Sequence, residues 1–308
     1  MTGLKPAQAA AAERRAADLA LEPMVPAGPT SGFFRGTRES LRSIWSYRGL
    51  LNLLFRRELK ARYKDSALGF VWSLIRPLAQ LAVYAIAIGQ FLGASKNLSE
   101  YPIYVFSGLT IWQYFSEIIS SGTGSILGNA GLVKKIYLPR EVFPLSVVAS
   151  ATFNFLMQMI VLLVGTFAFR KPPHPANLIY GLMAVAIVLL IGTALAFVLS
   201  AVNVYLRDVQ YIVEIVLMWG MWTAPIVYDW SLVSTHLHNG AIRQLYLANP
   251  ITEAVLGFQR AFWVSGGPHN TIPTLGRHMA IAIGVGVVLL WIGQRVFARL
   301  EANFAQEL

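Results

Sequence analysis

Several kinds of residue are scarce or absent in this sequence, and each absence excludes a class of protein. Cysteine does not occur, so the chain has neither a disulfide framework nor a catalytic thiol. Charged residues make up only 13% of the 308 positions, whereas a soluble domain has about 25%. Hydrophobic residues make up 56%, and the mean hydropathy is +0.55. This composition predicts one integral membrane domain and leaves no room for a second large soluble domain.

The motifs of nucleotide-binding and metal-dependent enzymes are also missing. No glycine is followed directly by lysine, so the chain has no phosphate-binding P-loop. No His-Glu-x-x-His motif occurs, and Gly122, Gly124 and Gly128 end an apolar run, which is the wrong context for a dinucleotide site. His236 and His238 have a spacing that could hold a metal, but surface histidines are the simpler interpretation. We therefore predict no catalytic residues, no metal site and no cofactor bound by this chain.

Long apolar runs recur along the chain. A bilayer core requires about 20 apolar residues per helix. Glu117 falls within the second such run and Glu214 within the fifth. No internal repeat relates the two halves, which disfavours an inverted-repeat carrier. The sequence predicts an all-α integral membrane fold with six transmembrane helices, at residues 69–93, 102–127, 142–169, 177–202, 209–228 and 278–298.

The distribution of basic residues predicts the orientation of these spans. The segment from Arg35 to Lys64 holds nine Lys or Arg and two acidic residues. Arg170 and Lys171 on the opposite side are a mild exception. Cytoplasmic loops are enriched in Lys and Arg, so both termini are expected in the cytoplasm of a bacterium, with the protein in its inner membrane. The net charge of +10 then reflects topology, and no nucleic-acid partner is expected.

Four parts of the chain follow from these patterns. They are a flexible N-terminal tail at 1–32, a cytoplasmic amphipathic interface segment at 33–68, a six-span membrane domain at 69–300 and a cytoplasmic tail at 301–308.

The interface segment contains a basic amphipathic helix directly before the first span. Leu51, Phe55, Leu59 and Tyr63 recur every four residues, and basic residues recur with the same spacing on another side. A helix of this kind lies in the headgroup layer with its charges on lipid phosphates. The candidate residues for lipid headgroups and for substrate uptake are Arg56, Arg57, Lys60, Arg62 and Arg76.

Arg76 allows two interpretations, because a charge at the edge of a span is a functional candidate by default. It could meet a lipid pyrophosphate. It could equally form a structural ion pair with Asp208 or Glu214.

The loop after the second span has the composition of a partner surface. Apolar residues stand beside basic ones, and Pro139 ends the segment and redirects the chain into the third span. An ordinary cytoplasmic loop rich in basic residues is the alternative. The candidate contacts are Leu132, Lys134, Lys135, Ile136, Tyr137 and Arg140.

Two further features concern the outer side. Residues 251–265 are apolar but too short to span, so they re-enter the membrane or rest on its surface. Aromatic rings can stack on the apolar faces of sugars, so Tyr84, Trp219, Trp222 and Tyr228 are candidates for lining a glycan pore. Membrane anchoring or helix packing is the alternative for these four rings.

Several short motifs, in this order, resemble the ABC-2 type permeases that export polysaccharides and polyol phosphates. The first comprises Glu58-Leu59-Lys60, Arg62-Tyr63, Ser66, Leu68-Gly69, Trp72 and Pro77. The others are Gly131 to Glu141, Asn203 to Asp208, and Asn249 to Glu253 followed by Gly257-Phe258. One departure is Gln259-Arg260, where the family often has a basic residue directly after the aromatic residue.

The resemblance implies an assembly and a function. Two copies of the chain would form a pore, and each would dock a separate ATPase, which binds ATP and Mg²⁺, on a coupling helix at 131–141. Paired re-entrant gate helices would include Asn249, Pro250, Phe258 and Phe262. The substrate would be a polysaccharide on a polyprenyl pyrophosphate, and a cell-wall galactan of actinobacteria is one candidate. The alternatives are a teichoic-acid or polyol-phosphate exporter, a membrane-embedded glycosyltransferase or acyltransferase, and a secondary carrier.

Overall fold

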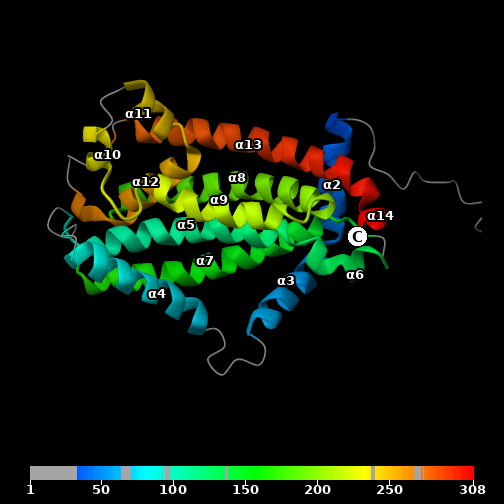
Figure 1. The fold of residues 1–308 in the computed structure, drawn as a ribbon, viewed down its shortest axis with the longest axis horizontal. Coiled ribbons are helices and arrows are strands. Elements are labelled where there is room, and N and C mark those ends of the chain that lie inside the picture. Colours follow the sequence, from blue (N-terminus) through cyan, green and yellow to red (C-terminus); the bar gives the residue numbers. More distant parts are fainter. Residues whose placement is uncertain are drawn as a thin grey trace, which may run out of the picture.

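The structure is a computed structural model that describes residues 33–63, 71–91, 93, 98–135, 138–236, 240–266, 272 and 274–308. Every regular element in these ranges is a helix, which confirms the all-α prediction. The longest helices lie side by side and form one elongated bundle (Figure 1).

Four helical segments are long and apolar enough to cross a membrane: Leu74–Phe91, Val142–Ala168, Pro175–Tyr205 and Leu275–Asn303. They coincide with the first, third, fourth and sixth predicted spans. The second predicted span is helix α5 (Tyr101–Thr123), which is long enough, but its Ser, Gln, Tyr and Glu residues lower its mean hydropathy. The fifth is α9 (Val209–Thr223), which is apolar but only 15 residues long. The count of six spans is therefore not established by length and composition.

Helix α8 (Leu178–Tyr205) is the centre of the bundle and packs against α5, α12 (Pro250–Phe262) and α13 (Leu275–Leu300). Small residues permit this close packing. A Cβ added at Gly122 of α5 would lie 2.7 Å from the Cβ of Ala196, and one added at Gly293 of α13 would lie 2.7 Å from the carbonyl oxygen of Ala194. The other long elements are α7 (Val142–Ala168) and α4 (Trp72–Tyr84), which continues as the π-helix η2 (Ala85–Phe91).

The segment between α9 and α13 gathers at one end of the bundle (Figure 1). It forms α10 (Trp230–His236), α11 (Gly240–Leu247), α12 and η6 (Val264–Gly266). Asn249 caps α12, since its side chain accepts a hydrogen bond from the backbone N–H of Ile251 at 3.1 Å. Eleven of the 13 residues of α12 are buried, including Phe258 and Phe262. This burial disagrees with a segment that rests on the lipid surface.

The opposite end holds α2 (Phe33–Ser46), α6 (Ala130–Val133) and α14 (Phe304–Glu307), with α3 (Arg48–Tyr63) nearby (Figure 1). The predicted interface segment is thus two helices. Among the described side chains of α3, Leu54 is the buried one, whereas Leu51, Phe55 and Leu59 are half-buried. The reason is that α3 packs against α7, where the Phe55 and Phe153 rings meet edge to face at 6.3 Å.

Helix α2 and the C-terminal residue lie at this same end of the bundle (Figure 1). The last residues are part of the packed domain, because Phe304 is fully buried against Phe297.

Candidate functional site

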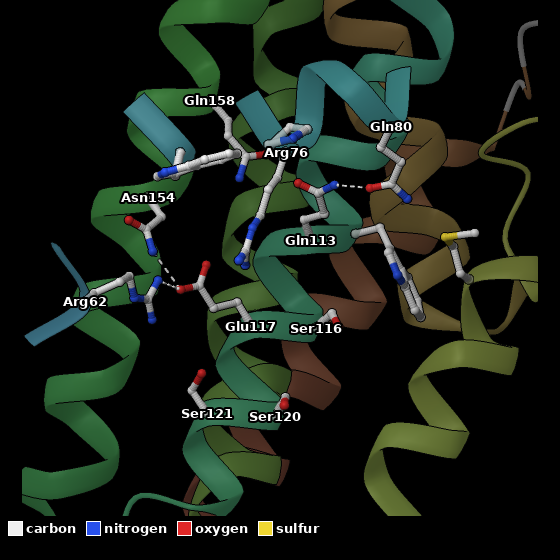
Figure 2. A pocket seen from close by; sticks show the side chains of 14 residues that line it. Arg62, Arg76, Gln80, Gln113, Ser116, Glu117, Ser120, Ser121, Asn154 and Gln158 are labelled. Atoms are coloured by element: carbon white, nitrogen blue, oxygen red, sulfur yellow. Dashed lines mark hydrogen bonds and ion pairs between the residues drawn. The ribbon is translucent and has the colours of Figure 1, made fainter. Parts of the chain in front are cut away.

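A polar cleft of about 920 Å³ opens between α4, α5 and α7. Figure 2 shows its polar side chains pointing toward one another from these helices. Its lining is Arg62, Trp72, Arg76, Pro77, Gln80, Trp112, Gln113, Ser116, Glu117, Ser120, Ser121, Asn154, Gln158 and Met221.

The sequence spacing on each helix explains why these polar residues converge. Residues three or four apart share a face of a helix. Gln113, Glu117 and Ser120 follow this spacing on α5, whereas buried apolar residues such as Ile118 occupy its other side. Arg76 and Gln80 lie four apart on α4, as do Asn154 and Gln158 on α7. Each of these three helices therefore presents a polar face to the cleft.

An ion pair spans this cleft. Arg62, at the end of α3, donates to the carboxylate of Glu117, and Asn154 Nδ2 donates to the same carboxylate oxygen at 2.6 Å (Figure 2). The side chains of Arg62 and Glu117 are 34% and 21% exposed. Solvent screens a pair of this exposure, so its contribution to stability is small, about 0.2–1 kcal/mol. Its main effect is to join α3, α5 and α7 at one point.

A second link joins α4 to α5, because Gln113 Nε2 donates to Gln80 Oε1 at 2.8 Å (Figure 2). Gln158 lies deeper, at 8% exposure, and its Oε1 has no hydrogen-bond partner within the described part of the chain. An oxygen in this state favours a ligand that donates a hydrogen bond.

Arg76 points into the cleft toward Glu117 (Figure 2). In the described ranges it forms no ion pair with Asp208 or Glu214, so the structural ion pair considered from the sequence is wrong. Glu214 instead accepts from Gln210 Nε2 at 3.2 Å. Two guanidinium groups therefore face a single carboxylate in the cleft, and this excess positive charge suits an anionic group.

The other predicted headgroup residues do not reach the cleft. Arg56 and Lys60 are exposed on α3, and Arg57 donates to Asn129 Oδ1 at the end of the bundle that carries α6. Among the five basic residues proposed from the sequence, only Arg62 and Arg76 line the cavity.

Comparison with known proteins decides the family. Residues 49–263 match the family described as ABC-2 type transporter. The chain belongs to this family. It is 32% identical over 269 residues to the O-antigen export system permease protein RfbA of Myxococcus xanthus, covering 87% of this chain and 98% of that protein. The protein of the same name from Klebsiella pneumoniae is 26% identical over 260 residues, or 84% and 95% of the two chains.

A further relative of this ABC-2 transporter matches only in part. The polysialic acid transport protein KpsM of Escherichia coli is 29% identical over 79 residues, which is 26% of this chain and 31% of that protein. The cleft residues, from Arg62 to Met221, all fall within the segment that matches the family.

The aromatic residues proposed for the pore of the transporter lie at the border of the cleft or outside it. Tyr84 accepts from Gln80 Nε2 at 3.4 Å, and its hydroxyl lies 3.8 Å from Met221 Sδ. Trp219 and Trp222 are 67% and 50% exposed on α9. Tyr228 donates to the carbonyl oxygen of Trp222 at 2.8 Å. Lining of a pore by these residues stays a prediction.

The predicted coupling segment of the transporter is exposed in part. Lys134 and Lys135 are exposed, but Leu132 is half-buried against the core of this end. The guanidinium of Arg140 lies 5.6 Å from the ring centre of Phe304 and so packs on the C-terminal helix. Ile136 and Tyr137 lie outside the described residues.

Glu141 fastens this segment to the rest of the transporter. It is 4% exposed and accepts from Gln294 Nε2 of α13 at 2.6 Å and from Ser40 of α2. The loop before α7 is thereby fixed to both α2 and α13. On α12, Arg260 lies 4.1 Å from the ring centre of Tyr180, a cation–π contact that gives this departure from the family pattern a packing role.

Sequence reasoning missed most of the cleft. Gln80, Gln113, Asn154 and Gln158 are uncharged, and each is a single polar residue in an apolar run. The signal that could have found them is the spacing of four between polar residues on α4, α5 and α7. The indoles that line the cleft, Trp72 and Trp112, were also missed in favour of the aromatic residues of α9.

Proposed function

We propose that this chain is the membrane-embedded half of an ATP-driven exporter that moves a polysaccharide on a polyprenyl pyrophosphate across the bacterial inner membrane. The observation that carries this proposal is the polar cleft, with its excess positive charge, in a chain that matches O-antigen export permeases over most of their length. The termini face the cytoplasm, where the basic residues of α2 and α3 meet anionic lipid.

The chemistry of the cleft suits such a substrate. Hydroxyl groups of sugars exchange hydrogen bonds with Ser, Gln and Asn side chains, and apolar sugar faces pack on indoles such as Trp112. The guanidinium groups of Arg62 and Arg76 pair with the pyrophosphate, since arginine binds phosphate oxygens through two parallel hydrogen bonds.

This balance of groups favours a polysaccharide over a polyol-phosphate polymer. A polymer with a phosphate in every unit requires many cations along its path. The described lining of the cleft contains two arginines and one glutamate among mostly neutral side chains.

Two copies of the chain form the complete pore in this proposal. The supporting feature is α9, whose apolar residues Ile212, Ile215, Val216 and Trp219 are more than half exposed on a single helix. A separate ATPase, which binds ATP and Mg²⁺, docks on the segment at 131–141. The exposed Lys134 and Lys135 support this site, and the chain itself needs no cofactor.

A deletion experiment tests the function. Cells without this chain should accumulate the lipid-linked polysaccharide on the inner leaflet and lose it from the cell surface, and a plasmid copy should reverse both effects. Unchanged surface polysaccharide, measured by immunoblot in the deletion strain, would contradict the proposal.

A further inference from the structure

A second, smaller cavity of about 390 Å³ adjoins the large cleft. Both cavities are lined by Ser120 and Ser121 of α5. The small cavity continues from these serines toward the end of α5, where α3 contributes Arg57 and Glu58 and the first turn of α9 contributes Gln210. The two cavities thus form one polar path along α5.

Two buried oxygen atoms in the walls of the small cavity lack hydrogen-bond partners among the described residues. Ser125 is 4% exposed, and its Oγ has none. Gln210 uses its Nε2 group to donate to the carbonyl oxygen of Ser120 at 3.3 Å and to Glu214, but its buried Oε1 accepts no bond. Leaving such atoms unpaired is unfavourable. Their presence in one cavity favours a ligand that donates hydrogen bonds.

The charges of the two cavities differ. In the small cavity, Arg57 is balanced by Glu58, and Arg57 is already bonded to Asn129. In the large cleft, Arg62 and Arg76 exceed the single carboxylate of Glu117. The large cleft is therefore suited to an anionic group and the small cavity to a neutral one.

We propose that the small cavity is a sugar subsite, formed by Glu58, Ser125 and Gln210, which binds the first sugar ring of the substrate while the diphosphate lies in the large cleft. Ring hydroxyls donate to Ser125 Oγ, Gln210 Oε1 and the carboxylate of Glu58. The inference rests on the proposed function and adds to it that the chain recognises a neutral, hydroxyl-rich ring and not the diphosphate alone.

Gly128 offers a means to fill this subsite. It lines the small cavity, and a Cβ added to it would meet no atom within 4 Å. A side chain added at this position therefore begins in open space beside the cavity, and leucine is chosen to fill it. Gly284 on α13 is the matched control, because it also has nothing within 4 Å of an added Cβ and lies outside both cavities.

The test measures equilibrium binding to the full chain in lipid nanodiscs. The probes are radiolabelled farnesyl diphosphate and its glucosyl, galactosyl and N-acetylglucosaminyl derivatives. The wild-type chain should bind at least one glycosylated probe about tenfold more tightly than farnesyl diphosphate, the effect of one or two net hydrogen bonds. Gly128→Leu and the double variant Ser125→Ala/Gln210→Met should lose this advantage and keep the affinity for farnesyl diphosphate. Gly284→Leu should keep both the tighter binding of the glycosylated probe and the affinity for farnesyl diphosphate.

The possible outcomes distinguish failure of the sugar-subsite proposal from failure of the proposed export function. Equal binding of all probes by the wild-type chain, or an advantage that survives in both cavity variants, would overturn the sugar subsite and leave the exporter proposal intact. Failure of every probe to bind would contradict the lipid-diphosphate substrate itself, and the subsite with it. Thermal unfolding of each purified variant verifies that a lost advantage does not reflect a misfolded chain.

Discussion

Arg62, in the last turn of α3, forms an ion pair with Glu117, in the polar stripe of α5. The pair connects the basic helix α3 with the wall of the cleft. Separation of α3 from α5 would break this pair and leave the guanidinium of Arg62 free in the cleft, while Glu117 keeps its hydrogen bond from Asn154.

A charge exchange tests this relationship. Arg62→Glu places two carboxylates against each other, so export should fall by about tenfold, equivalent to about 1.4 kcal/mol. The double variant Arg62→Glu/Glu117→Arg should recover part of the loss, because the pair is restored in reverse. Surface polysaccharide per copy of the protein is the measurement.

Arg56→Glu serves as the control for this exchange, since Arg56 is exposed on the same helix and does not line the cleft. If the double variant exports no better than Arg62→Glu, the two residues act separately and the ion pair has no role in export.

The buried hydrogen bonds of Glu141 predict a different effect, on stability. Gln294→Ala removes one of the two donors to this carboxyl group, whose residue is 4% exposed. The free energy of unfolding should fall by about 1.5–3 kcal/mol, the range for a hydrogen bond to a charged group. Thermal unfolding in detergent measures the change. The control is Gln306→Ala, at an exposed position of α14, which should unfold at the same temperature as the wild type. If Gln294→Ala also unfolds like the wild type, the hydrogen bond from Gln294 to Glu141 is not formed.

The sequence predicts the helices of this fold well but not its cleft. Runs of apolar residues depend only on local composition, so the bounds of α7 and α8 lie within three residues of the predicted spans. The fifth predicted span ends at Thr223 rather than at 228, because Pro225 cannot donate the hydrogen bond that a continued helix requires.

The cleft depends on which faces of three helices meet, and no local pattern determines that. Arg62 and Arg76 were found because charge near a span is rare and conspicuous. Gln113 and Gln158 were not, because one uncharged polar residue in an apolar run is compatible with many environments. The buried face of α3 was predicted one residue away from its observed position for a similar reason. Leu54 is buried because α3 packs against α7 and not against lipid.

The predicted coupling segment gives a third test. Reversal of charge at Lys134 and Lys135, combined with Tyr137→Ala, should release the ATPase and leave the membrane protein folded. Single exposed ion pairs contribute about 0.2–1 kcal/mol, so the combined change is needed. Co-purification of the ATPase with the tagged chain measures docking. The control is charge reversal at the exposed Arg277, toward the other end of the bundle. Retention of the ATPase by the triple variant would mean that the contact lies elsewhere. The Arg35–Lys64 segment would then be the next candidate.

The aromatic residues of α9 give a fourth test. If Trp222 contacts the glycan in the proposed dimer, Trp222→Phe should be mild and Trp222→Ala should slow export, because a ring contact contributes roughly 0.5–1.5 kcal/mol. Loss of Trp219 as well should nearly stop export. Export per copy of the protein is the quantity to measure. A fall in the amount of protein in the membrane, with export per copy unchanged, would indicate that these rings are lipid anchors.

The most direct test of the account asks what occupies the polar cleft during export. The absence of native cysteine allows single cysteines to carry a photoactivated cross-linker. They are placed at Ser116 in the cleft and, as a control, at Ile160, which is 54% exposed on α7. After illumination of exporting cells, the Ser116→Cys chain should carry covalently bound polysaccharide, and blocking synthesis of the lipid-linked precursor should abolish this product. Polysaccharide on the Ser116→Cys chain no greater than on the Ile160→Cys chain would contradict the claim that the cleft is the path of the substrate.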